Sequence, residues 1–297
     1  SLDDPDVAGK IIFLFIDHKK YDDALIILKG ILQKIPEDSD MNHLAGAAYD
    51  GNGQVDQALV HFNKVKDNSK FFENATIYIA YIYKNQDKPE KAIASLEQAI
   101  EKVSDNPEFY FYLGYFYEEY QNYPKAESVL KKGLEILPDS SRLHFRLGVV
   151  YDKWGKKEQS IEQMKKVIGL DPEDAHALNY LGYTYLDLDI NLGEAEKLIR
   201  KAMELEPKDG YITDSLGWIY FQKEDYEKAV LYLEKAAELS DYETVIAAHL
   251  AEAYLKTGQL EKAKAMYKKA LDNAGEDQQK EIREIEKQLE RLNDTAQ

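Results

Sequence analysis

The chain of 297 residues has no cysteine, which excludes disulfides and thiolate metal sites within it. It also lacks any run of about 18 apolar residues, the length that a membrane-spanning helix needs. Its most apolar stretch, residues 11–16, lies between Lys10 and Asp17, so we expect it to form a buried helix face. The chain starts with Ser1 rather than Met, as a chain with a tag remnant would, so the lack of a signal peptide says little about its compartment.

Basic residues are few relative to acidic ones. The chain has 38 Lys and Arg residues and 55 Asp and Glu residues, which gives a net charge of −17. Nucleic-acid phosphates and anionic membrane surfaces both attract clusters of Lys and Arg. The charge balance therefore argues against either as a partner, and the solubility of a long molecule with much surface is a sufficient explanation for it.

What the chain does contain is a repeat. Alanine or serine recurs in steps of 34 residues, with a single step of 35. The series is Ala24, Ala58, Ala92, Ala126, Ser160, Ala195, Ala229 and Ala263. A period of this size over nearly the whole chain indicates one supersecondary unit stacked many times. Each unit of such an array packs only on its neighbours, so an active site of the usual kind is not expected.

Other positions recur in register with this series. A small residue stands twelve places before most of the alanines, Leu usually precedes it, and Tyr follows three places after it. The small residues are Gly46, Ala80, Gly114, Gly148, Gly182, Gly217 and Ala251. The tyrosines are Tyr49, Tyr83, Tyr117, Tyr151, Tyr185, Tyr220 and Tyr254.

The spacing of these residues predicts pairs of helices. Leu, the small residue and Tyr share one stripe of a first helix. The small residue and the alanine of a second helix let the two helices approach closely, because a larger side chain would push them apart. Pro36, Pro138, Pro172 and Pro207 then stop second helices. The chain is therefore predicted to be all-α.

These residues resemble the tetratricopeptide repeat (TPR), a helix–turn–helix unit of about 34 residues. The resemblance covers about residues 5–275 and implies a right-handed superhelical solenoid of eight tandem repeats over residues 1–275. The repeats start near Pro5, Ser39, Glu73, Pro107, Ser141, Ala175, Gly210 and Thr244. The first repeat departs most from the pattern, with Ile12 at the small place and Phe15 at the tyrosine place.

The two ends of the array differ. Residues 276–297 are highly charged and carry Ile285 and Leu289 on one helical stripe, so we expect a C-terminal capping helix and tail. The N-terminal end has no such cap. Phe13 and Ile16 there suggest either a preceding repeat or a contact with another chain.

In the TPR family the first helices line the inner, concave face of the stack. The resemblance thus implies that the second, fifth, sixth, ninth and twelfth places of each repeat face a groove. These places hold many aromatic residues and two arginines, residue types that are enriched in binding hot spots. The candidate residues are Tyr78, Tyr81, Phe111, Tyr112, Tyr115, Arg142, Phe145, Arg146, His176, Asn179, Tyr180, Tyr183, Tyr211, Trp218 and Phe221.

Two features of this set have alternatives. The tyrosines could fill space between adjacent first helices instead of contacting a partner. Arg142 and Arg146 lie four residues apart on one face and could anchor a carboxylate of the partner. They could equally pair with Glu118 or Asp152 of this chain.

Known TPR specialisations are matched only in part. The carboxylate clamp for chaperone C-termini needs Lys, Asn and Arg on consecutive first helices, and only Arg142 and Arg146 match its last part. The asparagine ladder of O-linked sugar transferases is missing.

Residues 175–240 resemble the terminal repeats of bacterial TPR proteins. Many of those proteins are envelope lipoproteins, and some are adaptors for a processing protease. The lipidation cysteine is not in this chain, so the localisation stays open between the cytoplasm and an outer-membrane-anchored protein of the periplasm.

No pattern points to catalysis, a cofactor or a resident metal. The histidines form no His-Glu-x-x-His motif, and no glycine-rich phosphate loop occurs. His144 stands at a core place and is interpreted as a buried, hydrogen-bonded histidine. Residues 187–193 resemble the start of a calcium-binding loop, but Leu198 occupies the position where such a loop needs a bidentate Glu. They coincide with the one-residue insertion, so we expect an elongated turn.

The sequence therefore predicts a non-enzymatic adaptor that holds a peptide or protein segment in an aromatic groove. We expect a protein or peptide partner, no nucleic acid and no insertion into a membrane. Two alternatives stay open. One is a structural protein that associates with copies of itself through the N-terminal face, and the other is the recognition arm of a larger enzyme.

Overall fold

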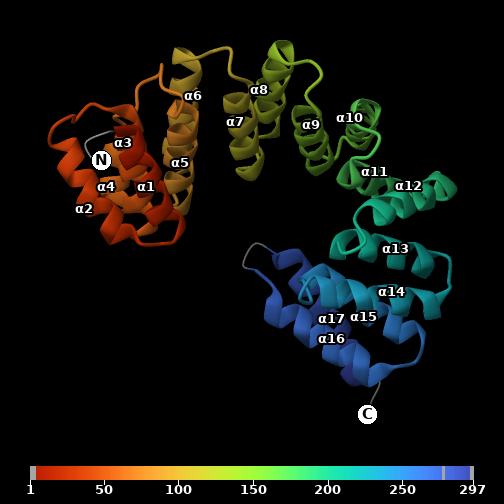
Figure 1. Cartoon of the computed structure of the whole chain (residues 1–297). Coiled ribbons are helices and arrows are strands. Elements are labelled where there is room, and N and C mark those ends of the chain that lie inside the picture. The colour runs from red at the N-terminus through yellow and green to blue at the C-terminus, as the bar shows by residue number, and fades with distance from the viewer. Residues whose placement is uncertain (1–4, 276–277, 295–297) are drawn as a thin grey trace. The chain divides into compact units, whose positions relative to one another are not determined.

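The computed structural model describes residues 5–275 and 278–294, and these residues form seventeen α-helices and no strand (Figure 1). The helices are α1 (Pro5–Asp17), α2 (Tyr21–Leu32), α3 (Ser39–Gly51), α4 (Val55–Phe62), α5 (Phe72–Asn85), α6 (Pro89–Lys102), α7 (Pro107–Glu119), α8 (Tyr123–Ile136), α9 (Ser141–Lys153), α10 (Lys157–Leu170), α11 (Ala175–Asp187), α12 (Leu192–Leu205), α13 (Gly210–Gln222), α14 (Tyr226–Leu239), α15 (Thr244–Lys256), α16 (Leu260–Asn273) and α17 (Gln279–Asp294). Odd-numbered helices up to α15 are the first helices of successive pairs, and even-numbered helices up to α16 are the second helices. The all-α solenoid predicted from the period is confirmed.

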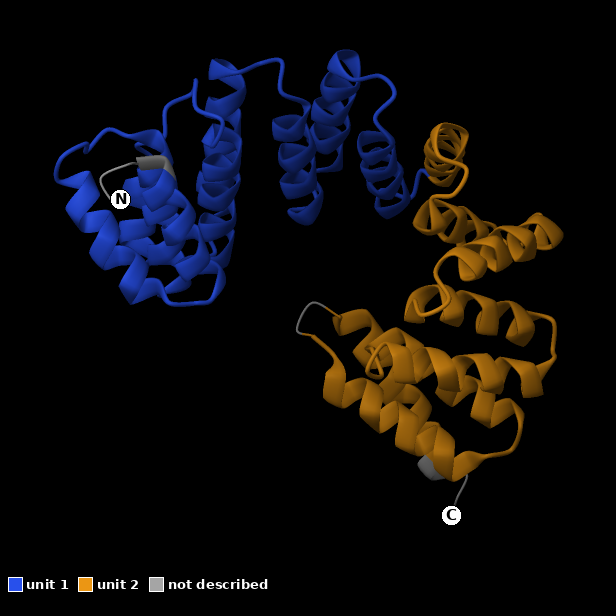
Figure 2. Cartoon of the chain, in the orientation of Figure 1, with its two compact units in different colours: residues 1–156 blue, residues 157–297 orange. Residues whose placement is uncertain are grey.

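The chain divides into two compact units, residues 1–156 and residues 157–297 (Figure 2). Unit 1 contains α1–α9 and unit 2 contains α10–α17. Within each unit, consecutive helices pack on one another. Each unit also has buried clusters of its own, such as the one around Phe62 and Phe109 in unit 1 and the one around Leu233 in unit 2.

Short polar side chains start several first helices. Ser140, Asp174 and Asp209 each accept a hydrogen bond from the backbone N–H three residues on, at 3.3, 2.8 and 2.9 Å. Such caps satisfy amide donors that the first helical turn leaves without a partner. The prolines that separate these caps from the preceding second helices are Pro138, Pro172 and Pro207.

The small residues of the first helices face the second helix of their own pair, as the spacing predicts. A Cβ atom on Gly114 would lie 2.5 Å from Leu130 Cγ, and one on Gly217 would lie 2.7 Å from Leu233 Cγ. The alanines of the second helices, such as Ala126, are fully buried. The close approach of the two helices therefore depends on the small residue.

The one-residue insertion lengthens the turn between α11 and α12. Residues 188–191 separate these two helices, whereas residues 120–122 separate α7 from α8. Asp189 and Asn191 adopt left-handed backbone conformations, with φ of 52° and 51°, which Asp and Asn tolerate better than most residues. The elongated turn expected at this place is confirmed.

The last helix, α17, packs on α15 and α16 of unit 2. Ile285 is 3% exposed and lies in a cluster with Tyr267, while Leu289 packs at the edge of that cluster. The helix begins at Gln279. Residues 276–277 and 295–297 of the predicted cap and tail lie outside the described residues.

Candidate functional site

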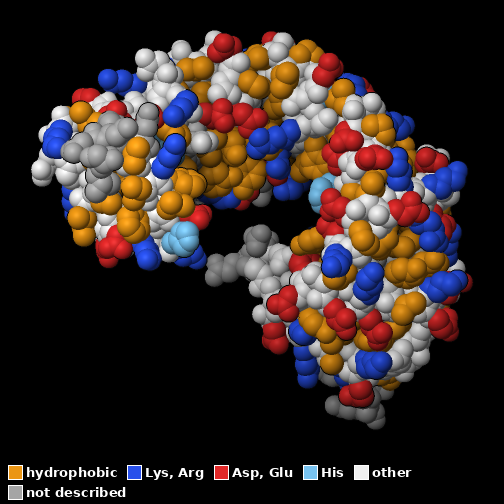
Figure 3. Space-filling model, in the orientation of Figure 1, with side chains coloured by type: hydrophobic (Ala, Val, Ile, Leu, Met, Phe, Trp, Pro, Cys, Tyr) orange, Lys and Arg blue, Asp and Glu red, His pale blue; other side chains and the backbone are white. Residues whose placement is uncertain are grey.

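Unit 1 carries a groove of about 1110 Å³ along its first helices. Many of its lining residues stand at the places of the repeat that the sequence assigns to an inner face. These are Gly9, Lys10, Phe13, Asp40, His43, Leu44, Asn74, Ile77, Tyr78, Tyr81 and Tyr112. Hydrophobic side chains gather on the part of unit 1 that these helices occupy (Figure 3). The groove offers apolar surface to a ligand, since Phe13 is 59% exposed and Tyr78 is 42% exposed.

Tyrosines on adjacent first helices contact one another on the α7 side of this groove. The ring of Tyr81 lies 6.2 Å from that of Tyr112, edge to face, and 6.4 Å from that of Tyr115. The Tyr115 hydroxyl accepts a hydrogen bond from Lys84 Nζ at 2.8 Å. Burial, together with the neighbouring tyrosines, raises the pKa of the Tyr81 hydroxyl. These tyrosines therefore also pack between first helices, which is the alternative that the sequence left open.

Both arginines of α9 bind carboxylates of unit 1. Arg146 Nη1 donates to Glu118 Oε2 at 2.9 Å, and the Glu118 side chain is 2% exposed. Arg142 pairs with Glu108, and its guanidinium carbon lies 3.8 Å from the centre of the Phe111 ring. Phe111 is only 8% exposed under this cover, so it offers a partner little surface. Carboxylates of the same unit thus pair with both arginines, although the buried Nε of Arg146 has no hydrogen-bond partner among the described residues.

His43 lies in the wall of the groove as a neutral ring. Neither of its nitrogens has a hydrogen-bond partner among the described residues, and it stacks on Phe71 with the ring centres 4.4 Å apart. Burial lowers the pKa of His43 to about 4, against a smaller opposing effect of Asp40. The imidazole therefore contributes to the aromatic wall and carries no charge at neutral pH.

Unit 2 contains a different cluster, built on α13 and α15. His249 Nδ1 lies 3.0 Å from both carboxylate oxygens of Asp214. The His249 ring stacks on Trp218 at 4.1 Å, and Trp218 stacks on Phe221 at 4.4 Å. Burial acts to lower the pKa of His249, but Asp214 outweighs it and the net shift is upward. The cluster is thus a largely buried ion pair beside stacked aromatic rings.

The other predicted residues differ in exposure. Tyr211 is 60% exposed, whereas Phe145 and Tyr180 are partly buried. Burial is also the main cause that raises the pKa of Tyr183 to about 12. Asn179 Oδ1 is buried and has no hydrogen-bond partner among the described residues. Of these five side chains, Tyr211 offers the largest exposed fraction to a partner.

The structure corrects the interpretation of His144 and, among the residues it describes, brings together one group of possible metal ligands. His144 is partly exposed rather than buried, because its ring reaches back over the turn before α9, with Nε2 2.9 Å from the carbonyl oxygen of Pro138. His176, Glu206 and Asp209 have possible ligand atoms within 4.8 Å of one another. His176 and Glu206 are exposed, and acidic surface groups commonly cluster without an ion, so this arrangement does not make a metal centre.

Sequence reasoning missed the polar residues that stand at the same inner places. Glu108, Asp214 and His249 occupy such places, but the choice made from the sequence covers only aromatic residues, arginines, His176 and Asn179 there and includes none of these three. A signal was present, because Asp214 and His249 are 35 residues apart and opposite in charge when the histidine is protonated. Opposite charges about one repeat apart on adjacent first helices predict a pair between the repeats.

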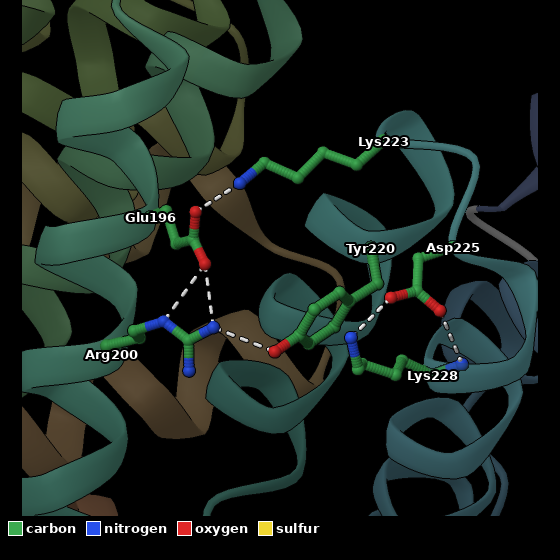
Figure 4. A network of polar contacts seen from close by, with 6 residues as sticks. All are labelled: Glu196, Arg200, Tyr220, Lys223, Asp225 and Lys228. Carbon is green, nitrogen blue, oxygen red and sulfur yellow. Dashed lines mark hydrogen bonds and ion pairs between the residues drawn. The ribbon is translucent and has the colours of Figure 1, made fainter.

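A polar network joins α12 to α13 (Figure 4). Glu196 accepts hydrogen bonds from Lys223 and, at 2.6 Å, from Arg200, and these bonds lower its pKa. Arg200 also donates to the Tyr220 hydroxyl at 2.7 Å. Tyr220 is one of the tyrosines that recur with the repeat, so we assign this network to the packing of neighbouring helix pairs.

Among the described helices, none is both long enough and apolar enough to cross a membrane.

Comparison with known proteins agrees with the repeat. Family models described as tetratricopeptide repeat match residues 85–147, 141–174 and 220–283. No curated protein matches the chain. The structure of pilF from Pseudomonas aeruginosa is 25% identical, with a TM-score of 0.51 over 57% of this chain and 77% of that one.

Two further solved structures share the fold at lower identity. A tetratricopeptide repeat protein from Parabacteroides merdae ATCC 43184 is 15% identical, with a TM-score of 0.66 over 86% of this chain and 98% of that one. A thermophilic TPR protein from Thermus thermophilus is 22% identical, with a TM-score of 0.54 over 63% and 98%. The matched repeats cover just over half of the sequence, and the helix pairs recur through the rest of the described residues. The chain belongs to the tetratricopeptide repeat family.

Proposed function

We propose that this protein is an adaptor that holds an apolar segment of a partner protein in the groove of unit 1. Proteins of the TPR family are protein–protein interaction scaffolds and are generally not enzymes. The observation that carries the proposal is the groove itself, in which partly exposed rings stand at equivalent places of adjacent first helices. Aromatic rings of this kind bury a large area at a low cost in side-chain entropy.

The charges of the groove favour an apolar segment over a charged one. Asp40 and Lys70, both in its lining, pair with each other at 3.2 Å. Arg142 and Arg146, which do not line the groove, are held by carboxylates of the same unit. Affinity would therefore come from apolar side chains of the partner against the exposed rings, and the preformed helix stack would limit the ordering cost of binding.

The first test identifies the partner segment by its place on the surface. A photo-crosslinking amino acid at Tyr78, inside the groove, should capture a defined segment of a partner in cells. The matched control carries the same group at Val60 on α4, which is 50% exposed and outside the groove. A capture pattern that is the same at both positions would contradict the proposal.

The second test measures the affinity of that segment as a synthetic peptide. Replacing Tyr78 and Tyr112 by Ala should raise the dissociation constant by roughly tenfold or more, as expected when hot-spot rings are lost. Tyr115 is left unchanged because Lys84 donates to its hydroxyl at 2.8 Å, a shorter hydrogen bond than the one of 3.3 Å from Arg142 to the Tyr112 hydroxyl. Val60→Ala is the matched control and should bind like the wild type. Unchanged affinity of the double tyrosine variant, with an unchanged circular dichroism spectrum, would reject the groove as the binding site.

A further inference from the structure

The second helix α4 ends nearly two turns earlier than most of its counterparts. It stops at Phe62 after 8 residues, whereas α6, α8, α10, α12, α14 and α16 each run for 14 residues. Residues 63–71 then lead to α5, whereas residues 103–106 are enough to connect α6 to α7. A cavity of about 220 Å³ lies at the end of α4 and is walled by α5 and α6.

This cavity and the groove of unit 1 lie on opposite sides of α5. The residues of α5 that line the groove are Asn74, Ile77, Tyr78 and Tyr81, and those that line the cavity are Phe72, Ala75, Thr76, Ile79 and Tyr83. At 3.6 residues per turn these two sets occupy opposite faces of the helix. The cavity is therefore a second candidate site of unit 1, separate from the groove.

Two lysines of α6 and no carboxylate are among the described residues that line the cavity. These are Lys91 and Lys102, whereas their sequence neighbours Glu90 and Glu101 do not line it. Both ammonium groups lie over aromatic rings of the cavity wall, 5.6 and 5.7 Å from the ring centres. Neither lysine pairs with a carboxylate among the described residues. In a chain with a net charge of −17, two such cations around one cavity favour an anionic occupant.

A buried hydroxyl in the same cavity lacks a hydrogen-bond partner. Thr76 lines the cavity and is 5% exposed, and its hydroxyl makes no hydrogen bond within the described part of the chain. Thr213 stands at the same place of the repeat in α13, and its hydroxyl donates to the backbone oxygen of Asp209 at 2.7 Å. Thr76 does not form the equivalent bond to Phe72. A buried hydroxyl without a partner costs free energy, which an acceptor group of a ligand would offset.

We propose that this cavity binds an acidic segment of a partner protein, in addition to the apolar segment that we assign to the groove. Lys91 and Lys102 are 11 residues apart on α6, which is about 16 Å along the helix axis and more than a single carboxylate spans. In an extended segment, two residues four positions apart are about 13 Å apart and point to the same side. Two acidic residues at that spacing match the two flexible lysines. The Thr76 hydroxyl would donate to the segment between them.

The probe is the peptide acetyl-Glu-Ser-Gly-Ser-Glu-amide, which carries two glutamates at this spacing. Titration of the full chain should shift the NMR resonances of Thr76 and Ser95, both in the cavity wall, and give a dissociation constant. The uncharged peptide acetyl-Gln-Ser-Gly-Ser-Gln-amide should bind roughly tenfold more weakly or less well still, because both ion pairs are lost. Equal affinity for the two peptides would overturn the proposal. Acetate that binds as tightly as the acidic peptide would show a site for a single carboxylate and would overturn it too.

Lys91→Glu/Lys102→Glu should raise the dissociation constant of the acidic peptide by roughly tenfold or more. The matched control is Lys125→Glu/Lys132→Glu on α8, which changes the net charge by the same amount. Lys125 lies 5.2 Å from the centre of the Tyr117 ring, as Lys91 lies over Tyr83 one repeat earlier, but it does not line the cavity. The control should bind like the wild type. Equal losses in both variants would reveal a general effect of charge and would reject the cavity as the site.

Thr76→Val tests whether the peptide enters the cavity. The change removes the hydroxyl but no hydrogen bond within the described part of the chain, so the stability should not fall, while the dissociation constant should rise several-fold. Unchanged affinity would mean that the peptide stays outside the cavity, contrary to the proposal. The groove variant Tyr78→Ala/Tyr112→Ala should bind the acidic peptide like the wild type, and Lys91→Glu/Lys102→Glu should bind the groove's segment normally. The two sites can therefore fail independently.

Discussion

The hydroxyl of Tyr117 on α7 donates a hydrogen bond to Glu97 Oε1 on α6, at 2.7 Å, and so joins one helix pair to the next. The same contact recurs from Tyr151 to Glu127 at 2.8 Å and from Tyr254 to Glu234 at 2.5 Å. Burial and the hydrogen bond to Glu97 raise the pKa of Tyr117 to about 12. The recurring tyrosine thus fills the core with its ring and binds the preceding second helix with its hydroxyl.

We expect Tyr117→Phe to lower the free energy of unfolding by about 1 kcal/mol at neutral pH, because the hydrogen bond is lost while the ring remains. In the unfolded chain a tyrosine ionises near pH 10, whereas Tyr117 in the folded protein ionises near pH 12. The stabilisation is therefore present below about pH 10 and is lost as the pH rises toward 12. The difference in unfolding free energy between wild type and variant should shrink over that interval. Urea unfolding followed by circular dichroism measures this difference.

Tyr78→Phe is the matched control for this prediction. Its ring is 42% exposed, so removal of the hydroxyl should leave the free energy of unfolding unchanged. The difference in unfolding free energy between wild type and Tyr117→Phe could instead stay constant from about pH 8 to about pH 11. That result would show that the folded protein does not hold the Tyr117 hydroxyl in its neutral form.

The repeat in the sequence predicts where such tyrosines lie but not what they bind. Tyr117, Tyr151 and Tyr254 stand at one place of the repeat and are 4%, 4% and 6% exposed. Their partners shift along the second helix, and Tyr220 accepts a bond from Arg200 instead of donating one to a glutamate. The period determines the position of the backbone and of Cβ. The partner of a long polar side chain depends on rotamers and on neighbouring residues that do not repeat.

Gly114 gives a prediction about helix packing. A Cβ atom at this position would lie 2.5 Å from Leu130 Cγ, which no ordinary contact allows. Gly114→Ala should therefore lower the free energy of unfolding by roughly 1–3 kcal/mol, since α7 and α8 must move apart. Gly30→Ala is the matched control on α2, where a Cβ would meet nothing within 4 Å. That change should stabilise the helix by roughly 0.5–1 kcal/mol. Similar effects of the two changes in urea unfolding would contradict this role of Gly114.

The candidate site was less predictable than the fold, because the register of a repeat says which face a residue lies on but not what covers it. Phe111 and Tyr211 both stand at inner places. Arg142 of the next first helix covers Phe111 and leaves it 8% exposed, whereas Tyr211 is 60% exposed. The sequence also left two partners open for Arg146, and the structure selects Glu118. Which side chain covers a ring, and which carboxylate an arginine binds, depends on how far the side chains of one helix extend toward the next.

The pair of His249 and Asp214 gives a prediction about pH in unit 2. Burial opposes protonation of His249, but the Asp214 carboxylate at 3.0 Å outweighs it, with smaller support from Glu252 and Glu243. The pKa of His249 is therefore above its ordinary value of 6.5. A raised pKa in the folded state means that the stabilisation is complete below about pH 6.5 and is lost as the pH rises through the folded pKa.

We expect Asp214→Asn to remove the charge that keeps His249 protonated, so that burial then lowers the pKa of His249 below 6.5. The variant should lose about 3 kcal/mol of unfolding free energy at mildly acidic pH, where the pair is fully charged in the wild type, and less at alkaline pH. Histidine resonances followed by NMR measure the pKa. His43 in unit 1 is the internal control, because burial holds its pKa at about 4 without Asp214. If the His249 resonance titrates at the same pH in wild type and Asp214→Asn, the carboxylate is not what keeps this buried imidazole charged.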